Sequence, residues 1–133
     1  MNGKMIEEAL FAAGDYFGGA LLGGITAAVV RGLVGPGTDM VVAMLYGMGI
    51  GMVVHLAIGL ALTPLLGMFH AMIPGSLIGM YGGMFFGMRD SMQTHASSLH
   101  HAIGVGVAFG IVTIASIKLY DCALRSTTTK PTP

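Results

Sequence analysis

Charge and cysteine are both scarce in this sequence, and each shortage excludes several classes of protein. Its 133 residues include six Lys or Arg and six Asp or Glu, so charged residues make up 9% of the chain, against about 25% in an ordinary soluble domain. The equal numbers of acids and bases leave no basic surface for nucleic acid. Because Cys122 is the single cysteine, an intramolecular disulfide and a cysteine-based zinc or iron–sulfur site are excluded.

Charge is missing above all from the middle of the chain, where residues 40–88 contain no Asp, Glu, Lys or Arg. Apolar residues make up 54% of the whole sequence. One membrane-spanning helix needs about 20 apolar residues, so a chain of this length has room for about four. We therefore expect an all-α integral membrane protein with about four transmembrane helices, in contact with the lipid bilayer.

Turn-forming and polar segments divide the chain into its expected parts. The stretch 35–39 combines Gly and Pro, Pro64 lacks a backbone donor, and residues 89–98 form the longest polar loop. Residues 64–73 fit either a loop or a short interfacial helix. Together these signals predict an N-terminal interfacial segment (1–15), a single transmembrane domain (16–120) with spans at about 16–34, 40–62, 73–92 and 99–119, and a short polar tail (121–133).

The basic residues near the predicted spans favour one orientation, because Lys and Arg concentrate on the cytoplasmic side of membrane proteins. We therefore expect both termini in the cytoplasm, with the protein in a membrane such as the bacterial inner membrane. In this orientation four basic residues are cytoplasmic and two lie on the opposite side, namely Lys4, Lys118, Arg125 and Lys130 against Arg31 and Arg89.

A glycine repeat organises the middle of the chain. Residues 44–52 and 80–88 both fit the pattern MxxGMxxGM, and glycine also recurs with a step of four in residues 19–23 and 106–110. In lipid, helices associate through close backbone approach over small residues rather than through burial of apolar surface. The repeat predicts a central, Met/Gly-rich antiparallel hairpin. Its predicted packing residues are Gly47, Gly51, Gly75, Gly79, Gly83 and Gly87.

Methionine follows the same step of four and permits two interpretations. Thioether sulfur is a soft, uncharged ligand that suits Cu(I), and rows of it on two helices would form a ladder of weak sites. The MxxxM spacing on one span and the GxxxG spacing on another locally resemble those of the eukaryotic copper-uptake transporters. The predicted fourth span is a difference from that family. Alternatively, methionine is a flexible apolar filler beside glycine. The candidate ligands are Met44, Met48, Met52, Met80, Met84, Met88 and Met92.

Histidine supplies further candidates. His95, His100 and His101 lie at the expected outer mouth of the last span, where they either bind a metal or act only as polar anchors. His55 lies inside the second span, and a histidine at that depth is a functional candidate as proton relay, metal ligand or haem ligand. The alternative is a single hydrogen bond to a neighbouring helix, and a haem b site would require a second axial ligand.

The sequence contains none of the motifs that indicate an enzyme, such as a Ser-His-Asp spacing, paired intramembrane carboxylates, a Gly-rich phosphate loop or HExxH. We therefore expect a non-enzymatic protein. Its glycine-rich faces offer more packing surface than one four-helix bundle needs, which predicts a small accessory subunit of a larger membrane complex or a homo-oligomer. The alternatives are Cu(I) handling along the methionine rows and, as a minor one, a haem-b-binding anchor.

Overall fold

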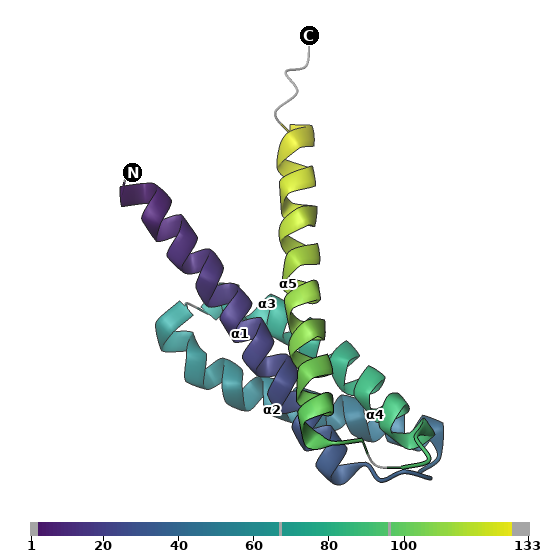
Figure 1. The fold of residues 1–133 in the computed structure, drawn as a ribbon. Helices are drawn as coiled ribbons and strands as arrows, with labels where there is room; N and C mark the ends of the chain where they lie inside the picture. Colours follow the sequence, from purple (N-terminus) through teal and green to yellow (C-terminus); the bar gives the residue numbers. More distant parts are fainter. Residues whose placement is uncertain (1–2, 67, 96, 129–133) are drawn as a thin grey trace.

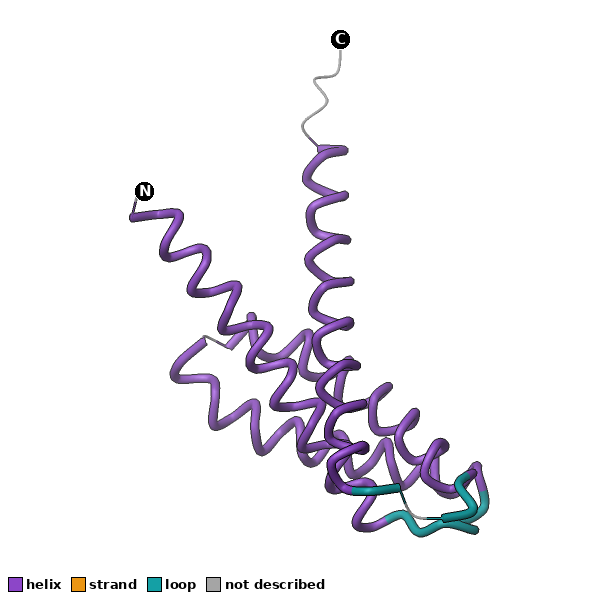
Figure 2. Tube along the Cα trace, in the orientation of Figure 1, coloured by secondary structure: helices purple, strands orange, loops and turns teal. Residues whose placement is uncertain are grey.

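The computed structural model describes residues 3–66, 68–95 and 97–128, and every regular element among them is a helix (Figure 2). Three of the helices, α1, α2 and α5, are long and apolar enough to cross a membrane. The expected all-α membrane architecture is therefore confirmed. The elements are α1 (Gly3–Leu33), α2 (Met40–Leu66), α3 (Met68–Leu77), the π-helical turn η1 (Ile78–Gly82), α4 (Gly83–Met92) and α5 (Leu99–Thr128).

The helices form two antiparallel pairs. One pair joins α1 to α5, and the other joins α2 to the continuous segment made of α3, η1 and α4. The chain termini lie at one end of the molecule, where α1 and α5 diverge, and the 34–39 and 93–98 connections lie at the other end (Figure 1). The second pair is the predicted central Met/Gly-rich hairpin, which the structure confirms.

Two helices extend beyond the expected span boundaries. Helix α1 begins at Gly3 and runs without a break through the expected interfacial segment, and α5 continues to Thr128 through much of the expected polar tail. Residues 129–133 of that tail lie outside the described residues. An ion pair between Arg125 and Asp121, 3.0 Å long and one turn apart, supports the extension of α5, because charges spaced i,i+4 stabilise a helix.

Of the two alternatives for residues 64–73, a loop or a short helix, the structure shows mainly helix. Helix α2 continues through Pro64 to Leu66, and α3 begins at Met68, so most of the 64–73 segment is helical. Pro74 lies inside α3, where its missing N–H leaves a carbonyl without its helical donor. The π turn η1 follows four residues later.

The π turn also keeps a row of glycines facing α2. Along an α-helix, residues four apart drift by about 40° around the axis, so a row from Gly75 to Gly87 would wind away from its partner. A π-helix bonds i→i+5 and places more residues in each turn, which rotates the row back. Accordingly Gly75, Gly79, Gly83 and Gly87 all lie against α2.

In the inner pair, the backbones of α2 and the returning segment touch at glycine. A methyl group at Gly79 would lie 2.6 Å from the Gly51 carbonyl oxygen, and one at Gly47 would overlap the Gly83 carbonyl group. The contact continues to Gly87 opposite Ala43. The six glycines singled out in the sequence thus all lie in this crossing.

The outer pair repeats the same construction. A methyl group at Gly106 would lie 2.6 Å from the Ala27 side chain and would also overlap the Gly23 carbonyl group. Gly110 meets Gly19 in the same way. The sequence pattern indicated these two rows without indicating that they face each other.

Small residues at both crossings leave room for larger side chains between the two pairs. Val30, Ala43 and Phe86 are buried together in one cluster, and Leu22, Ile78 and Ile114 form another. The Phe86 ring packs edge-on against Phe109 with 5.6 Å between centroids. Side chains of α2, η1 and α4 that point toward α1 and α5 therefore build the core.

We expect Gly47→Ala to lower the free energy of unfolding by about 1–3 kcal/mol, because the added methyl forces two backbones apart. Detergent-solubilised protein titrated with SDS and followed by circular dichroism provides the measurement. Gly49→Ala is the matched control, since Gly49 lies on the same helix with nothing within 4 Å of the added methyl. Equal effects of the two substitutions would contradict the backbone-contact interpretation.

Candidate functional site

The two methionine rows lie on one outer face of the inner pair. Six of the methionines directly follow a contact position, a residue whose backbone touches the other helix, as Met48 follows Gly47 and Met84 follows Gly83. Met40 and Met92 continue the two rows with the same step of four. In an antiparallel pair, the residues after the contact positions fall on the same side of the interface in both helices, because the helices run in opposite directions. We call this surface the methionine face; it comprises Met40, Met44, Met48, Met52, Met80, Met84, Met88 and Met92.

The opposite side of the same crossing faces the core. The residues that precede the contact positions include Ile78 and Phe86, which are fully buried, and Ile50, which packs against the core cluster. On the methionine face, Met44, Met48, Met84 and Met88 are half-buried. Toward its edges the side chains are more open, as Met52 shows with an exposed fraction of 44%. Within this chain the methionines therefore border the crossing and do not fill its core.

Two pairs of methionines lie beside neighbouring backbone contacts of the crossing. Met48 and Met84 flank the Gly47/Gly83 contact, while Met44 and Met88 flank the contact of Ala43 with Gly87. Two thioethers are thus available at each of two neighbouring levels. Soft ligands of this kind suit Cu(I) and Ag(I).

The candidate histidines of the last loop do not gather into a site. His95, His100 and His101 are all exposed. In the described part of the chain, no group of three or more His, Cys, Asp or Glu side chains is arranged to hold a metal ion.

His55 is buried inside the inner crossing, with an exposed fraction of 6%. A methyl group at Gly75 would lie 2.5 Å from the ring, and one at Gly79 would lie 2.8 Å from the His55 Cβ. No described residue forms a hydrogen bond with Nδ1, so the alternative of one bond to a neighbouring helix is not realised there. Helix backbone occupies the space beside the ring, which does not fit a haem.

At the loop end of the molecule, polar contacts link the connecting segments to helices α1 and α4. The Arg31 Nε donates a hydrogen bond to the Ser97 carbonyl oxygen, and the Gly37 N–H donates one to the Ser91 carbonyl at 3.4 Å. Asp90 is buried beside them, with an exposed fraction of 7%. Arg31 on α1 thus helps to hold the 93–98 connection against the bundle.

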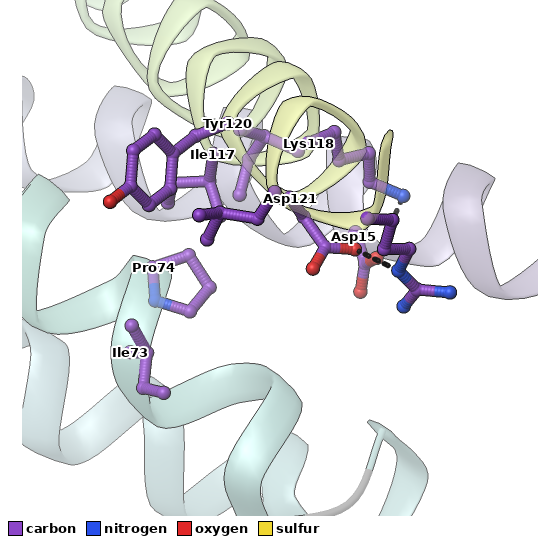
Figure 3. A pocket seen from close by; sticks show the side chains of 10 residues that line it. Asp15, Ile73, Pro74, Ile117, Lys118, Tyr120 and Asp121 are labelled. Carbon is purple, nitrogen blue, oxygen red and sulfur yellow. Dashed lines mark ion pairs between the residues drawn. The ribbon is translucent and has the colours of Figure 1, made fainter. Parts of the chain in front are cut away.

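At the opposite end, a cavity of about 530 Å³ opens between α1, α3 and α5 (Figure 3). We call it the interfacial cavity. Lys118 forms an ion pair with Asp15, 2.9 Å long, and its ammonium lies 5.4 Å from the centre of the Tyr16 ring. The remaining wall is largely apolar. The lining residues are Asp15, Ile73, Pro74, Ile114, Ile117, Lys118, Tyr120, Asp121, Leu124 and Arg125.

Sequence spacing alone does not bring these two charges together. Asp15 and Lys118 are more than a hundred residues apart in the chain, and their proximity depends on the pairing of α1 with α5. The one feature of the sequence that could have indicated this ion pair is the presence of opposite charges at matching ends of two spans. The cavity itself follows from the divergence of the helices, which composition does not encode.

Comparisons of this chain with models of protein families, with curated proteins and with solved structures find no match.

We expect Gly75→Ala to destabilise the protein because the added methyl collides with the His55 ring. In a His55→Ala background, which lacks that ring, Gly75→Ala should lower the free energy of unfolding by a smaller amount. The double-mutant cycle, measured by SDS titration, should show a coupling of about 1 kcal/mol or more. Gly32→Ala serves as the control, since its methyl meets nothing within 4 Å. Additive effects would show that Gly75 and His55 act independently.

Proposed function

We propose that this protein is a non-catalytic subunit of a membrane assembly, which docks through its methionine face onto a helical membrane protein or a second copy of itself. The observation that carries the proposal is that both glycine rows are used inside the chain while the methionine face points outward. The glycine contacts act as the internal framework. The proposed docking surface therefore differs from the one expected from the sequence, which was the set of glycine-rich helix faces.

The composition of α2 supports this role for the methionine face. Its other exposed positions carry side chains typical of a surface in contact with lipid, such as Leu45, Val53 and Leu60. Methionine is confined to the stripe beside the crossing. Because methionine is flexible and polarisable, it adapts to the irregular surface of another helix better than branched side chains do.

The proposal places both termini in the cytoplasm, in a membrane such as the bacterial inner membrane. The N-terminal end of α1 and the C-terminal end of α5 lie at the same end of the molecule (Figure 1). This arrangement agrees with an even number of membrane crossings. The basic residues of the sequence favour this end as the cytoplasmic one.

Thiol labelling tests the orientation directly. Cys122 is exposed on α5, and a membrane-impermeant maleimide added to intact cells should leave it unlabelled. Thr94→Cys, made in a Cys122→Ser background, should react because residue 94 is exposed at the opposite end. Reaction of both cysteines from the same side would contradict the proposed crossings.

A second candidate function is the handling of Cu(I), for which the pairing of methionines from two helices on one face provides the support. Two or three thioethers bind Cu(I) without charged groups that would be costly to place in lipid. Successive levels along the methionine face would pass the ion from site to site. This function does not exclude docking, since a partner could receive the metal.

One set of variants separates the two functions. Met44, Met48, Met84 and Met88 changed together to Leu should keep the fold in mild detergent, because Met-to-Leu exchanges usually cost less than about 1.5 kcal/mol each. Stoichiometric Cu(I) or Ag(I) in the wild type that disappears in this variant would favour metal handling instead.

A bulky change to the same face tests docking. Met48→Trp together with Met84→Trp should reduce the native mass to that of the single chain, whereas Leu45→Trp together with Val53→Trp, at exposed α2 positions off the face, should not. A wild-type protein that is a single chain in native membranes extracted with mild detergent would overturn the proposal.

A further inference from the structure

The interfacial cavity lies at the level of one membrane surface. Helix α1 carries no charge between Asp15 and Arg31, and α5 carries none from residue 99 to Lys118. At 1.5 Å per residue these intervals are about 24 and 28 Å long, close to the thickness of the hydrocarbon layer of about 30 Å. The Asp15–Lys118 ion pair, and the cavity that it lines, therefore lie where lipid headgroups meet the acyl chains.

The cavity has an apolar part and a charged part. Figure 3 shows Ile73 and Pro74 of α3 facing Ile117 of α5 across the cavity, with Asp15 and Lys118 at its other end. An occupant that matches this lining needs an apolar portion and a charged portion at the membrane surface. A phospholipid has this shape and lies at this depth.

The charges of the lining are balanced. Two acids, Asp15 and Asp121, and two bases, Lys118 and Arg125, form two ion pairs. Each ion pair uses one carboxylate oxygen, so the second oxygen of each Asp can accept a hydrogen bond. The Lys118 ammonium has further N–H groups that can donate hydrogen bonds. A headgroup with one negative and one positive group fits this set, whereas a group of one sign meets repulsion from half of it.

We infer that the interfacial cavity binds a zwitterionic phospholipid whose headgroup carries a primary amine. The lipid phosphate accepts hydrogen bonds from Lys118 and Arg125, and the ammonium group donates to Asp15 and Asp121. One acyl chain lies along Ile114 and Ile117. A quaternary ammonium group has no N–H to donate. Quaternary amines bind in cages of several aromatic rings, and among the described residues that line the cavity only Tyr120 is aromatic.

Native mass spectrometry of the purified full-length protein measures this selectivity. The protein in mild detergent is mixed with phosphatidylethanolamine, phosphatidylcholine and phosphatidylglycerol of identical acyl chains. We expect phosphatidylethanolamine to bind about tenfold more tightly than either of the others, the effect of one or two charge-assisted hydrogen bonds. Equal binding of the three lipids would overturn the inference.

A matched pair of substitutions tests the site. Asp121→Lys gives the cavity a net positive charge and should reverse the preference in favour of phosphatidylglycerol. Glu8→Lys makes the same charge change on an exposed position of α1 that does not line the cavity, and it should leave the preference unchanged. If both variants shift the preference equally, or if Asp121→Lys shifts nothing, the cavity is not the site.

Folding of the variants is checked by circular dichroism, and Asp121→Asn provides a milder change. Asp121 is exposed and its ion pair with Arg125 is a surface pair, which contributes little to stability. Asp121→Asn should lose the preference for the primary amine without gaining one for phosphatidylglycerol. This result does not depend on docking at the methionine face, which lies on α2, η1 and α4.

Discussion

Direct contact between helix backbones at glycine sets the distance between the paired helices of this chain. Membrane helices gain no association energy from burying apolar surface, because lipid is equally apolar, and depend instead on close packing. At the Gly47/Gly83 and Gly23/Gly106 contacts, a carbonyl oxygen occupies the space that a Cβ would take. Such proximity brings Cα–H groups within reach of carbonyl oxygens across the interface. The larger core side chains, the methionine face and the cavity all take their positions from these two crossings.

Pro74 and η1 together resolve a conflict that the glycine rows create. Along an α-helix, glycines spaced by four residues wind around the axis, so a long row turns gradually away from a straight partner. A proline followed by a π turn changes the number of residues per turn at the place where the row would leave α2. The π turn thus helps to keep all four glycines in contact with α2.

The sequence predicted the helical class, the central hairpin and its contact glycines because those features depend on local spacing. It did not predict the continuity of α2 through Pro64, because a proline near a helix end is tolerated when packing holds the remaining turns. It also missed the pairing of α1 with α5 and hence the cavity lined by Asp15 and Lys118. The histidines at 95, 100 and 101 illustrate the converse: they are close in sequence, yet the structure leaves them exposed and apart from any cluster.

The order of pairing along the chain has a consequence for synthesis. The α2–α4 hairpin can close as soon as residue 92 has entered the membrane, whereas α1 cannot meet its partner until α5, which begins at Leu99, has been made. One helix pair is therefore nested inside the other, and the outer contact has the longer loop to close. During that interval the small-residue stripe of α1, built around Gly19 and Gly23, is without its partner helix. Helix α1 is thus the first helix to be synthesised and among the last to pack against its partner.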